Sequence, residues 1–164
     1  MSWRGYTNPQ ERFLACLPYL LPLVVSTIFG VYIFTQFPLL SFLLVLLIPI
    51  APLAHGIPGL VMFFMLYALV VRNSQLSHFL RFNTMQALLV DLGLSIMSLL
   101  FQLLGISGGQ LLSNTIGSLL ISTIFSTLFL GTVAIVAYSW FMIVQGKYPE
   151  VPVISAAAYY HVRY

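Results

Sequence analysis

The sequence contains very little charge. Of its 164 residues, six are Lys or Arg and three are Asp or Glu. Charged residues therefore make up 5%, against about 25% in a typical soluble domain. In contrast, 60% of the residues are hydrophobic, and the mean hydropathy is +1.03. This balance excludes an ordinary soluble domain and predicts a membrane protein.

Cysteine and catalytic motifs are also scarce. Cys16 is the only cysteine, which excludes an intramolecular disulfide and is typical of a small core residue. The chain lacks the His-Glu-x-x-His, Gly-x-Ser-x-Gly and Gly-x-x-x-x-Gly-Lys patterns of zinc proteases, serine hydrolases and phosphate-binding loops. His55 and His161 have no second ligand at metal spacing. We therefore expect no enzymatic activity, no metal and no cofactor.

The few basic residues follow a simple pattern along the chain. They fall in the N-terminal tail, in one polar connection and in the C-terminal tail: Arg4 and Arg12, Arg72 and Arg81, Lys147 and Arg163. Because basic residues near span ends are retained in the cytoplasm, the pattern predicts an even number of spans, with both tails and the connection 73–80 inside. The net charge of +3 then reflects orientation and lipid headgroups, not a nucleic-acid partner.

We predict an all-α polytopic membrane protein that forms one membrane domain, 1–164, with the N and C termini inside. Four spans are expected, at about 13–34, 56–71, 79–104 and 115–144. Pro18 and Pro22 each remove a backbone hydrogen bond, so kinked or broken helices are expected in the N-terminal half. No secretory or organellar leader pattern is visible, and we expect the first apolar run to be a retained span.

The segment 39–50 is ambiguous, because prolines and glycines interrupt the apolar sequence around it. It reads either as a partial or interfacial helix or as a fifth span. Five spans would place Arg72 and Arg81 on the opposite side from Arg12, so the charge pattern favours four.

Asp91 is an acid within an apolar segment. It follows Arg81 by ten positions, which on a helix is about 15 Å, near the bilayer midplane. A charged carboxylate facing lipid there would cost at least about 2.5–3.5 kcal/mol. At about 100° per residue, Asp91 shares one helix face with Thr84, Ser95, Ser98 and Gln102. This polar stripe is predicted to face protein or water, as a packing surface or as the lining of a pathway or proton site.

The last apolar helix has two rows of small residues at four-residue spacing. One row is Ser118, Ser122 and Ser126, and the other is Thr123, Thr127 and Gly131. Such spacing lets helix backbones approach closely. It predicts helix packing, within this chain or with another.

The entrance to the third span is unusually polar. Its members are Arg72, His78, Arg81, Asn83 and Gln86. Arg81 opposes the dipole of the helix that it begins, so its position is explained by orientation, or by pairing with a headgroup phosphate or a partner carboxylate. His78 could titrate near neutral pH, although a surface histidine is the commoner case.

Two stretches resemble the Tic20 family. The first is RFLACLPYLLP at 12–22, followed by QFP at 36–38, and the second is VRN at 71–73, followed by SHFLRFNTMQALLVD at 77–91. The resemblance covers about Trp3 to Tyr148. It implies a four-helix membrane protein with both tails on the stromal or cytoplasmic side. In plastids, such a protein is a core component of the protein-import translocon at the inner envelope membrane. The resemblance implies no catalytic residue.

The absence of a transit-peptide pattern makes the chain more similar to cyanobacterial or plastid-encoded members, in a plasma, thylakoid or inner envelope membrane. We expect a translocon subunit that helps form or support a path for polypeptide, with other membrane subunits, the lipid bilayer and a polypeptide substrate as partners. The alternatives are a non-conducting accessory subunit of a larger complex and a small proton or solute transporter that uses Asp91.

Overall fold

The structure, a computed structural model, describes residues 8–106 and 116–162. Arg4, Arg163, position 115 of the predicted fourth span and most of the connection before it lie outside these residues. Throughout the described part of the chain, the regular elements are helices. In chain order they are α1 (Pro9–Cys16), η1 (Leu17–Tyr19), α2 (Leu20–Ser26), α3 (Val31–Gln36), η2 (Pro38–Ser41), α4 (Phe42–Leu47), α5 (Ala51–Ala54), α6 (Gly56–Leu66), η3 (Tyr67–Val71), α7 (His78–Leu103), α8 (Ile116–Val144) and α9 (Ile154–His161).

The first predicted span, 13–34, is not one kinked helix but a series of short pieces. α1 begins with Pro9 at its first position and leads through the 3₁₀ turn η1 into α2, and a further turn separates α2 from α3. Pro18 and Pro22 cannot donate backbone hydrogen bonds, so the regular α-helical pattern is interrupted here. A side chain of α8 compensates, because the indole Nε1 of Trp140 donates to the carbonyl oxygen of Cys16 at 3.1 Å.

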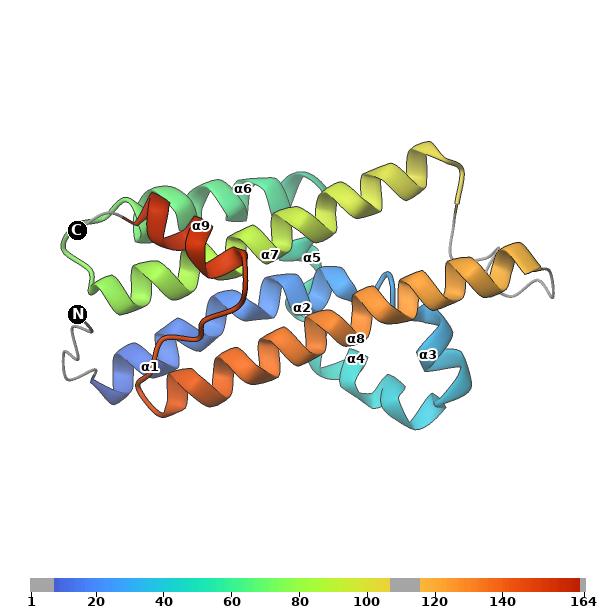
Figure 1. The fold of residues 1–164 in the computed structure, drawn as a ribbon, viewed down its shortest axis with the longest axis horizontal. Coiled ribbons are helices and arrows are strands. Elements are labelled where there is room, and N and C mark those ends of the chain that lie inside the picture. The colour runs from blue at the N-terminus through green and yellow to red at the C-terminus, as the bar shows by residue number, and fades with distance from the viewer. Residues whose placement is uncertain (1–7, 107–115, 163–164) are drawn as a thin grey trace.

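The long axis of the molecule is set by α1–α2, α7 and α8, which run along one another (Figure 1). Both α1 and α2 pack against α7 and α8. The core between them includes edge-to-face contacts of Phe29 with Phe101 and Phe125. The N-terminal broken helix is therefore the central element that joins the two long helices.

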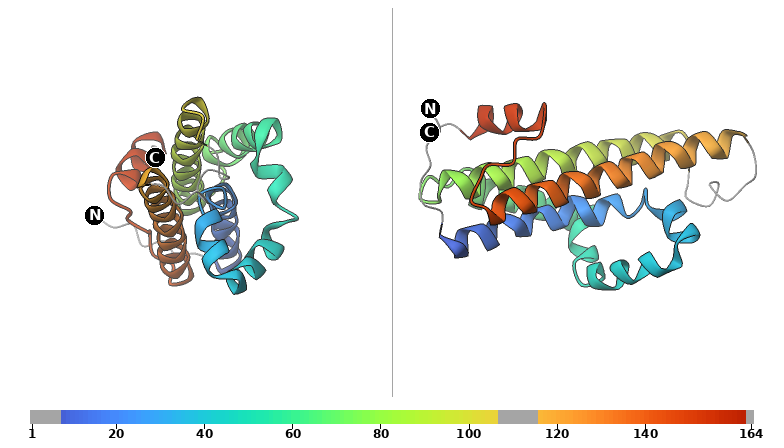
Figure 2. Two further views of the ribbon diagram at one scale, coloured as in Figure 1. Left: turned by 90° about the vertical axis from the view of Figure 1, so that its right-hand side faces the viewer. Right: turned by 60° about the horizontal axis from the view of Figure 1, so that its bottom comes forward.

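α3 packs on α8, where the Phe34 and Phe129 rings lie 5.2 Å apart between centroids. Residues 38–55 then leave the bundle as an arch of short helices (Figure 2). The predicted interfacial segment 39–50 is divided between η2, α4 and the turn that follows α4. Pro38, Pro49 and Pro52 limit the helix lengths. The arch exposes large apolar side chains, among them Leu39, Phe42 and Leu46.

The second predicted span, 56–71, has the expected boundaries. α6 continues without a gap into one π-helical turn, η3. Sixteen residues of helix measure about 24 Å, which is shorter than the roughly 30 Å hydrocarbon core of a bilayer. η3 packs along α7.

The two long helices, α7 and α8, match the third and fourth predicted spans to within a residue where the structure describes them. Both are long and apolar enough to cross a membrane. A core helix of a soluble protein would be mostly buried, but only 44% of the apolar window of α7 and 28% of that of α8 are buried. Their exposed apolar surface is typical of helices that face lipid.

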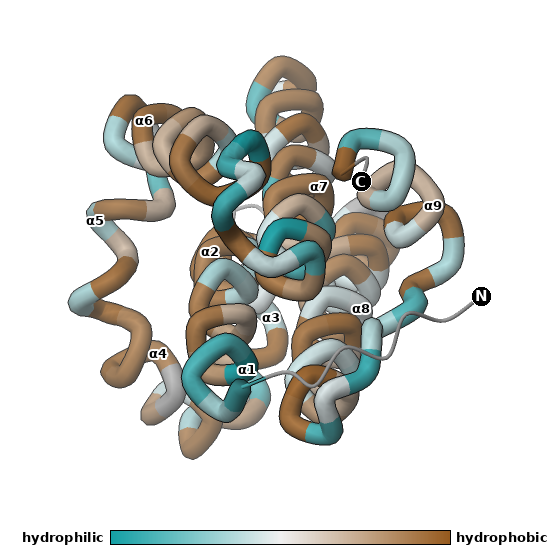
Figure 3. The backbone as a smooth tube through the Cα atoms, turned by 90° about the vertical axis from the view of Figure 1, so that its left-hand side faces the viewer, coloured by the Kyte–Doolittle hydropathy of each residue, from teal (hydrophilic) through white to brown (hydrophobic). Residues whose placement is uncertain are grey.

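Polar residues gather at one end of the bundle (Figure 3). The beginning of α1, the α6–α7 turn and the end of α8 all lie at this end, whereas the other ends of α7 and α8 lie far from it (Figure 1). The placement of this end on one side of a membrane, with both tails and the connection 73–80 inside, stays a prediction.

The C-terminal tail packs on the chain itself. Its helix α9 lies against α7, where Ala158 and Val162 share a core cluster with Phe82 and Leu88. Tyr159 contributes its ring, 4.4 Å from that of Phe82 between centroids. An apolar stripe on α7 that faces α9 explains this docking.

Candidate functional site

A fully buried polar cluster joins the broken N-terminal helix to the two long helices. We define the Tyr19 cluster as Tyr19, Asn83, Gln86 and Ser139, each 0% exposed. Gln86 donates from Nε2 to the Tyr19 hydroxyl at 3.0 Å, and that hydroxyl lies 3.4 Å from its acceptor, Oδ1 of Asn83. Ser139 of α8 lies beside the same hydroxyl. The cluster therefore links η1, α7 and α8 through one phenol group.

The breaks at Pro18 and Pro22 place Tyr19 where it can serve all three segments. Tyr19 ends the short turn η1. Asn83 and Gln86 are three residues apart on α7 and so lie on one helix face. Asn83 also donates from Nδ2 to the carbonyl of Phe79 at 2.8 Å. Two buried polar atoms of the cluster, Oε1 of Gln86 and Oγ of Ser139, have no hydrogen-bond partner among the described residues.

Arg81 is bonded to the end of the preceding helix. Its Nε donates to the carbonyl oxygen of Val71, the last residue of η3, at 2.9 Å. A cation is favourable at a helix C-terminus, where unpaired carbonyls concentrate negative charge. Arg81 is unfavourable in the first turn of α7, where it opposes the helix dipole, and its hydrogen bond to the C-terminal end of η3 offsets this effect. Neither a lipid phosphate nor a partner carboxylate is needed to place it.

A second arginine caps the C-terminal end of the long helix α8. Arg12 of α1 donates from Nη1 to the carbonyl of Val144, the last residue of α8, at 2.9 Å. Two of the basic residues that predicted orientation thus also cap the C-terminal ends of neighbouring helices. Arg72, in contrast, is exposed in the turn after η3.

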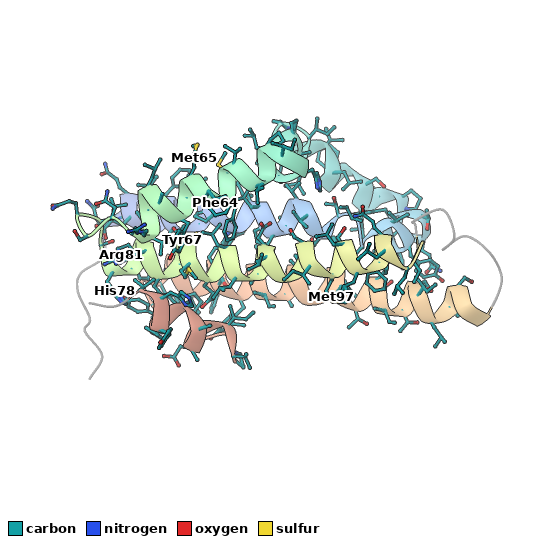
Figure 4. The ribbon with its side chains drawn as sticks, turned by 90° about the horizontal axis from the view of Figure 1, so that it is seen from above. Phe64, Met65, Tyr67, His78, Arg81 and Met97 are labelled. Carbon is teal, nitrogen blue, oxygen red and sulfur yellow. The ribbon has the colours of Figure 1, made fainter. Side chains whose placement is uncertain are left out.

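His78 connects the beginning of α7 to the C-terminal tail. Its Nδ1 lies 3.1 Å from the Tyr148 hydroxyl and its Nε2 lies 3.2 Å from the Val162 carbonyl. The Tyr159 ring stacks on the imidazole at 6.3 Å. Figure 4 shows His78 on the side of α9 and Arg81 on the side of α6. His78 is therefore a structural junction and not an isolated surface histidine.

The predicted polar stripe on α7 becomes progressively more exposed along the helix. Thr84 is fully buried, Asp91, Ser95 and Ser98 are half-buried, and Gln102 is exposed and donates to Ser98 Oγ at 3.1 Å. The stripe was predicted to face protein or water. Its first residue lies inside the protein, and the orientation of its exposed end toward water stays a prediction. Thr84 Oγ1 and Asp91 Oδ1 are shielded from solvent but have no hydrogen-bond partner among the described residues.

The two small-residue rows of α8 have different environments. Ser118 and Ser122 are buried and Ser126 is half-buried. Thr123, Thr127 and Gly131 are exposed. The threonine hydroxyls donate to Leu119 and Thr123 carbonyls of their own helix, and no atom lies within 4 Å of a Cβ built at Gly131. The second row therefore has no packing role within the described chain.

The sequence analysis missed the structural roles of Tyr19, Trp140 and Arg12. One signal could have revealed Tyr19: a phenol between two prolines of an apolar segment needs an internal hydrogen-bond partner. The bond from Trp140 to the Cys16 carbonyl could not be anticipated, because the two residues are 124 positions apart.

The all-helical described chain and its lipid-type surface define a helical membrane protein. Its sequence matches the family model described as chloroplast import apparatus Tic20-like over residues 7–158. It is 33% identical over 167 residues to the Tic20 family protein of Synechocystis sp. (strain ATCC 27184 / PCC 6803 / Kazusa), covering 100% of both chains. The chain therefore belongs to the Tic20 family, as the two sequence motifs predicted.

The chain is also similar in sequence to Tic20 proteins of plastids. Protein TIC 20-II, chloroplastic, of Arabidopsis thaliana is 38% identical over 107 residues, which are 63% of this chain and 51% of that protein. The Tic20 family protein Ycf60 of Porphyra purpurea is 33% identical over 159 residues, covering 92% of this chain and 75% of that protein. Both chloroplast and cyanobacterial proteins are thus among its relatives.

Proposed function

We propose that this protein is a membrane subunit of a protein translocon, and that it helps form or support a path for polypeptide across the inner envelope or a cyanobacterial membrane. The observation that carries the proposal is the match to the import-apparatus family over residues 7–158. Tyr19, His78 and both helix-capping arginines lie within the matched range.

The packing supports a path beside the bundle and not through it. Tyr19, Phe29 and Phe82 are at most 1% exposed. The polar groups of the Tyr19 cluster bond mainly to one another, and so they do not offer a wet lining to a passing chain. A polypeptide path would then be formed together with other membrane subunits, for which the exposed arch and α6 provide apolar surface.

We further propose four spans with both tails inside. The broken segment α1–α2–α3, the continuous segment α6–η3, α7 and α8 would each cross the bilayer, and residues 39–50 would lie at its edge. The positions of Arg12, Arg72, Arg81 and Lys147 near span ends on one side of this arrangement support it.

Photo-crosslinking in native membranes tests the translocon role. A photoreactive residue at Leu46 of the arch should crosslink to a translocating polypeptide stalled by a folded domain, or to subunits that contact it. Recovery of the stalled polypeptide in a complex with this chain is the expected result. If the chain is purified in mild detergent without any translocon subunit or stalled polypeptide, the proposal is wrong and an accessory role in another complex is favoured.

Asp91 favours one alternative, a small proton or solute transporter. Its shielded carboxylate oxygen without a partner is the kind of intramembrane acid that transporters use. In that case, the purified chain in liposomes should move protons, and Asp91→Asn should abolish the flux while leaving the fold intact. Equal flux in both proteins would exclude this alternative.

A further inference from the structure

Asp91 lies on a face of α7 that the described chain leaves incompletely paired. We define the Asp91 face as Asp91, Ser95, Ser98 and Gln102. Eleven positions separate its ends, so it runs for about 16 Å, or three helical turns. Asp91 Oδ1 is shielded from solvent without a hydrogen-bond partner, and two turns earlier on the same side the fully buried Thr84 hydroxyl also lacks one. A buried acceptor without a donor is unfavourable, which indicates that a donor belongs here.

The described chain cannot supply a cationic donor. Arg81 is ten positions away, about 15 Å along the helix, and its Nε is bonded to Val71. Arg12 and Lys147 lie at the same end of the bundle as Arg81, where they are bonded to Val144 and Gln145. Acyl chains have no donor at this depth. No described side chain donates a hydrogen bond to Asp91 Oδ1, and a donor on another molecule would complete the site.

The remainder of the Asp91 face is open to such a molecule. Phe101 packs on Phe125 of α8, with ring centroids 4.8 Å apart, and on the helix it is turned about 100° from Gln102. Gln102 is exposed and Leu103 is 84% exposed. The face thus combines small hydroxyl side chains, an acid at one end and apolar residues beside it, which is the composition of an interface between transmembrane helices.

We propose that the Asp91 face binds a transmembrane helix of a different subunit, and that this helix places a hydrogen-bond-donating side chain, basic or amide, opposite Asp91. Charge selects a different subunit over a second copy of this chain. Two copies packed through this face would oppose two carboxylates, whereas a helix with a donor satisfies the acid. The inference rests on the proposed translocon function, because it names the kind of partner that the subunit contacts there.

Matched photoprobes on α7 test the proposal in native membranes. A photoreactive residue is placed at Gln102, on the Asp91 face, or at Leu100, which is also exposed but points in nearly the opposite direction. We expect the Gln102 probe to crosslink to another membrane subunit and the Leu100 probe to yield that product at least about tenfold less. Equal yields from the two positions, a product containing two copies of this chain, or a Gln102 probe that reacts only with lipid would each overturn the proposal.

Substitutions then test the role of the acid. Asp91→Leu should lower the Gln102 crosslink about tenfold, a loss that corresponds to about 1.4 kcal/mol of interhelical affinity. Asp91→Asn retains a polar side chain and should keep most of the yield. Leu92→Ala, on an exposed apolar position, is the control and should leave it unchanged. An undiminished crosslink in Asp91→Leu overturns the proposal.

A second variant covers the case in which Asp91→Leu does not accumulate. Ser98→Leu changes only a half-buried position of the same face, and it should also lower the crosslink of the Gln102 probe. No loss with Ser98→Leu would count against the proposal. Co-purification of translocon subunits distinguishes a failure of this proposal from a failure of the translocon function. If translocon subunits co-purify with the chain but none of them crosslinks to the Gln102 probe, the translocon function stands and the Asp91 face is not the binding surface.

Discussion

At the scale of single residues, Tyr19 is the side chain on which the most segments depend. Its hydroxyl joins Gln86 and Asn83 of α7, with Ser139 of α8 beside it. Inside a membrane protein such bonds have no water to replace them. This single oxygen atom therefore helps to fix how the broken N-terminal helix meets α7.

We predict that Tyr19→Phe lowers the stability of the purified protein. The substitution keeps the ring but leaves Gln86 and Asn83 with unpaired buried groups, at a cost of about 1–3 kcal/mol. In a thermal melt in detergent, that is about 2–4 °C per kcal/mol for a chain of this size. Tyr32→Phe is the matched control, because the Tyr32 hydroxyl accepts from exposed Gln36. Equal melting temperatures for the two variants would refute the role of the cluster.

Two glycines allow a second comparison. A Cβ at Gly59 would lie 2.6 Å from the carbonyl oxygen of Ala54, whereas one at Gly131 meets nothing within 4 Å. Because the obstacle at Gly59 is backbone, we expect Gly59→Ala to displace α6 from α5 and to cost about 1–3 kcal/mol. Gly131→Ala, in the middle of α8, should be neutral or stabilise by up to about 1 kcal/mol. Melting curves that rank the variants in the opposite order would contradict this.

At the scale of elements, contacts between helix ends organise the molecule. Arg81 caps η3 and Arg12 caps α8. His78 bonds to Tyr148, just after α8, and to Val162, at the end of α9. All of these bonds lie at the end of the bundle where the basic residues gather, so this end is cross-linked by polar contacts. Toward the other end, aromatic packing of Phe29, Phe101 and Phe125 contributes to the core.

We predict that His78→Ala loosens the C-terminal tail. The loss of two hydrogen bonds, about 1 kcal/mol each, would raise the population of undocked α9 by roughly 5- to 30-fold. Limited proteolysis of the purified protein should then cut the segment 147–153 faster, since cleavage follows the open population. His55→Ala is the control, because His55 is not among the described residues that contact the tail, and its segment 147–153 should be cut at the same rate as in the unchanged protein. The tail contact has no such role if both variants behave alike.

At the scale of the whole molecule, topology and oligomeric context decide the function. The described chain exposes apolar surface on the arch, on α6 and along both long helices. Lipid covers part of such a surface, and partner subunits would cover the rest. The proposed orientation determines which end of the Asp91 face such partners would reach from each side of the membrane.

Cysteine labelling measures this orientation directly. In a Cys16→Ala background, single cysteines at Gln10, Ser74 and Glu150 should all react with an impermeant maleimide from the cytoplasmic or stromal side. A cysteine at Leu104, which is 71% exposed at the other end of α7, should react only from the opposite side. Labelling of any of the first three from the same side as Leu104 would disprove the proposed arrangement, and labelling of Gln10 and Glu150 from opposite sides would disprove an even number of spans.

The sequence was informative wherever the signal was local. The boundaries of α7 and α8 follow from uninterrupted apolar segments and flanking polar residues. The family followed from two contiguous motifs, one of which contains His78, Arg81, Asn83 and Gln86. Pro18 and Pro22 predicted a break in the first segment, although not its division into α1, η1, α2 and α3.

The tertiary structure alone decided which polar residues meet. The cluster joins Tyr19 to residues 64 and 67 positions later, and His78 meets groups 70 and 84 positions later. Whether Thr123 faces a helix or the outside depends on how α8 is rotated against α1 and α2, and periodicity is silent about that rotation. Composition and charge order determined the class of protein and its predicted orientation, because the bilayer acts on each segment separately. The pairing of side chains required the packed bundle, because it depends on contacts between segments.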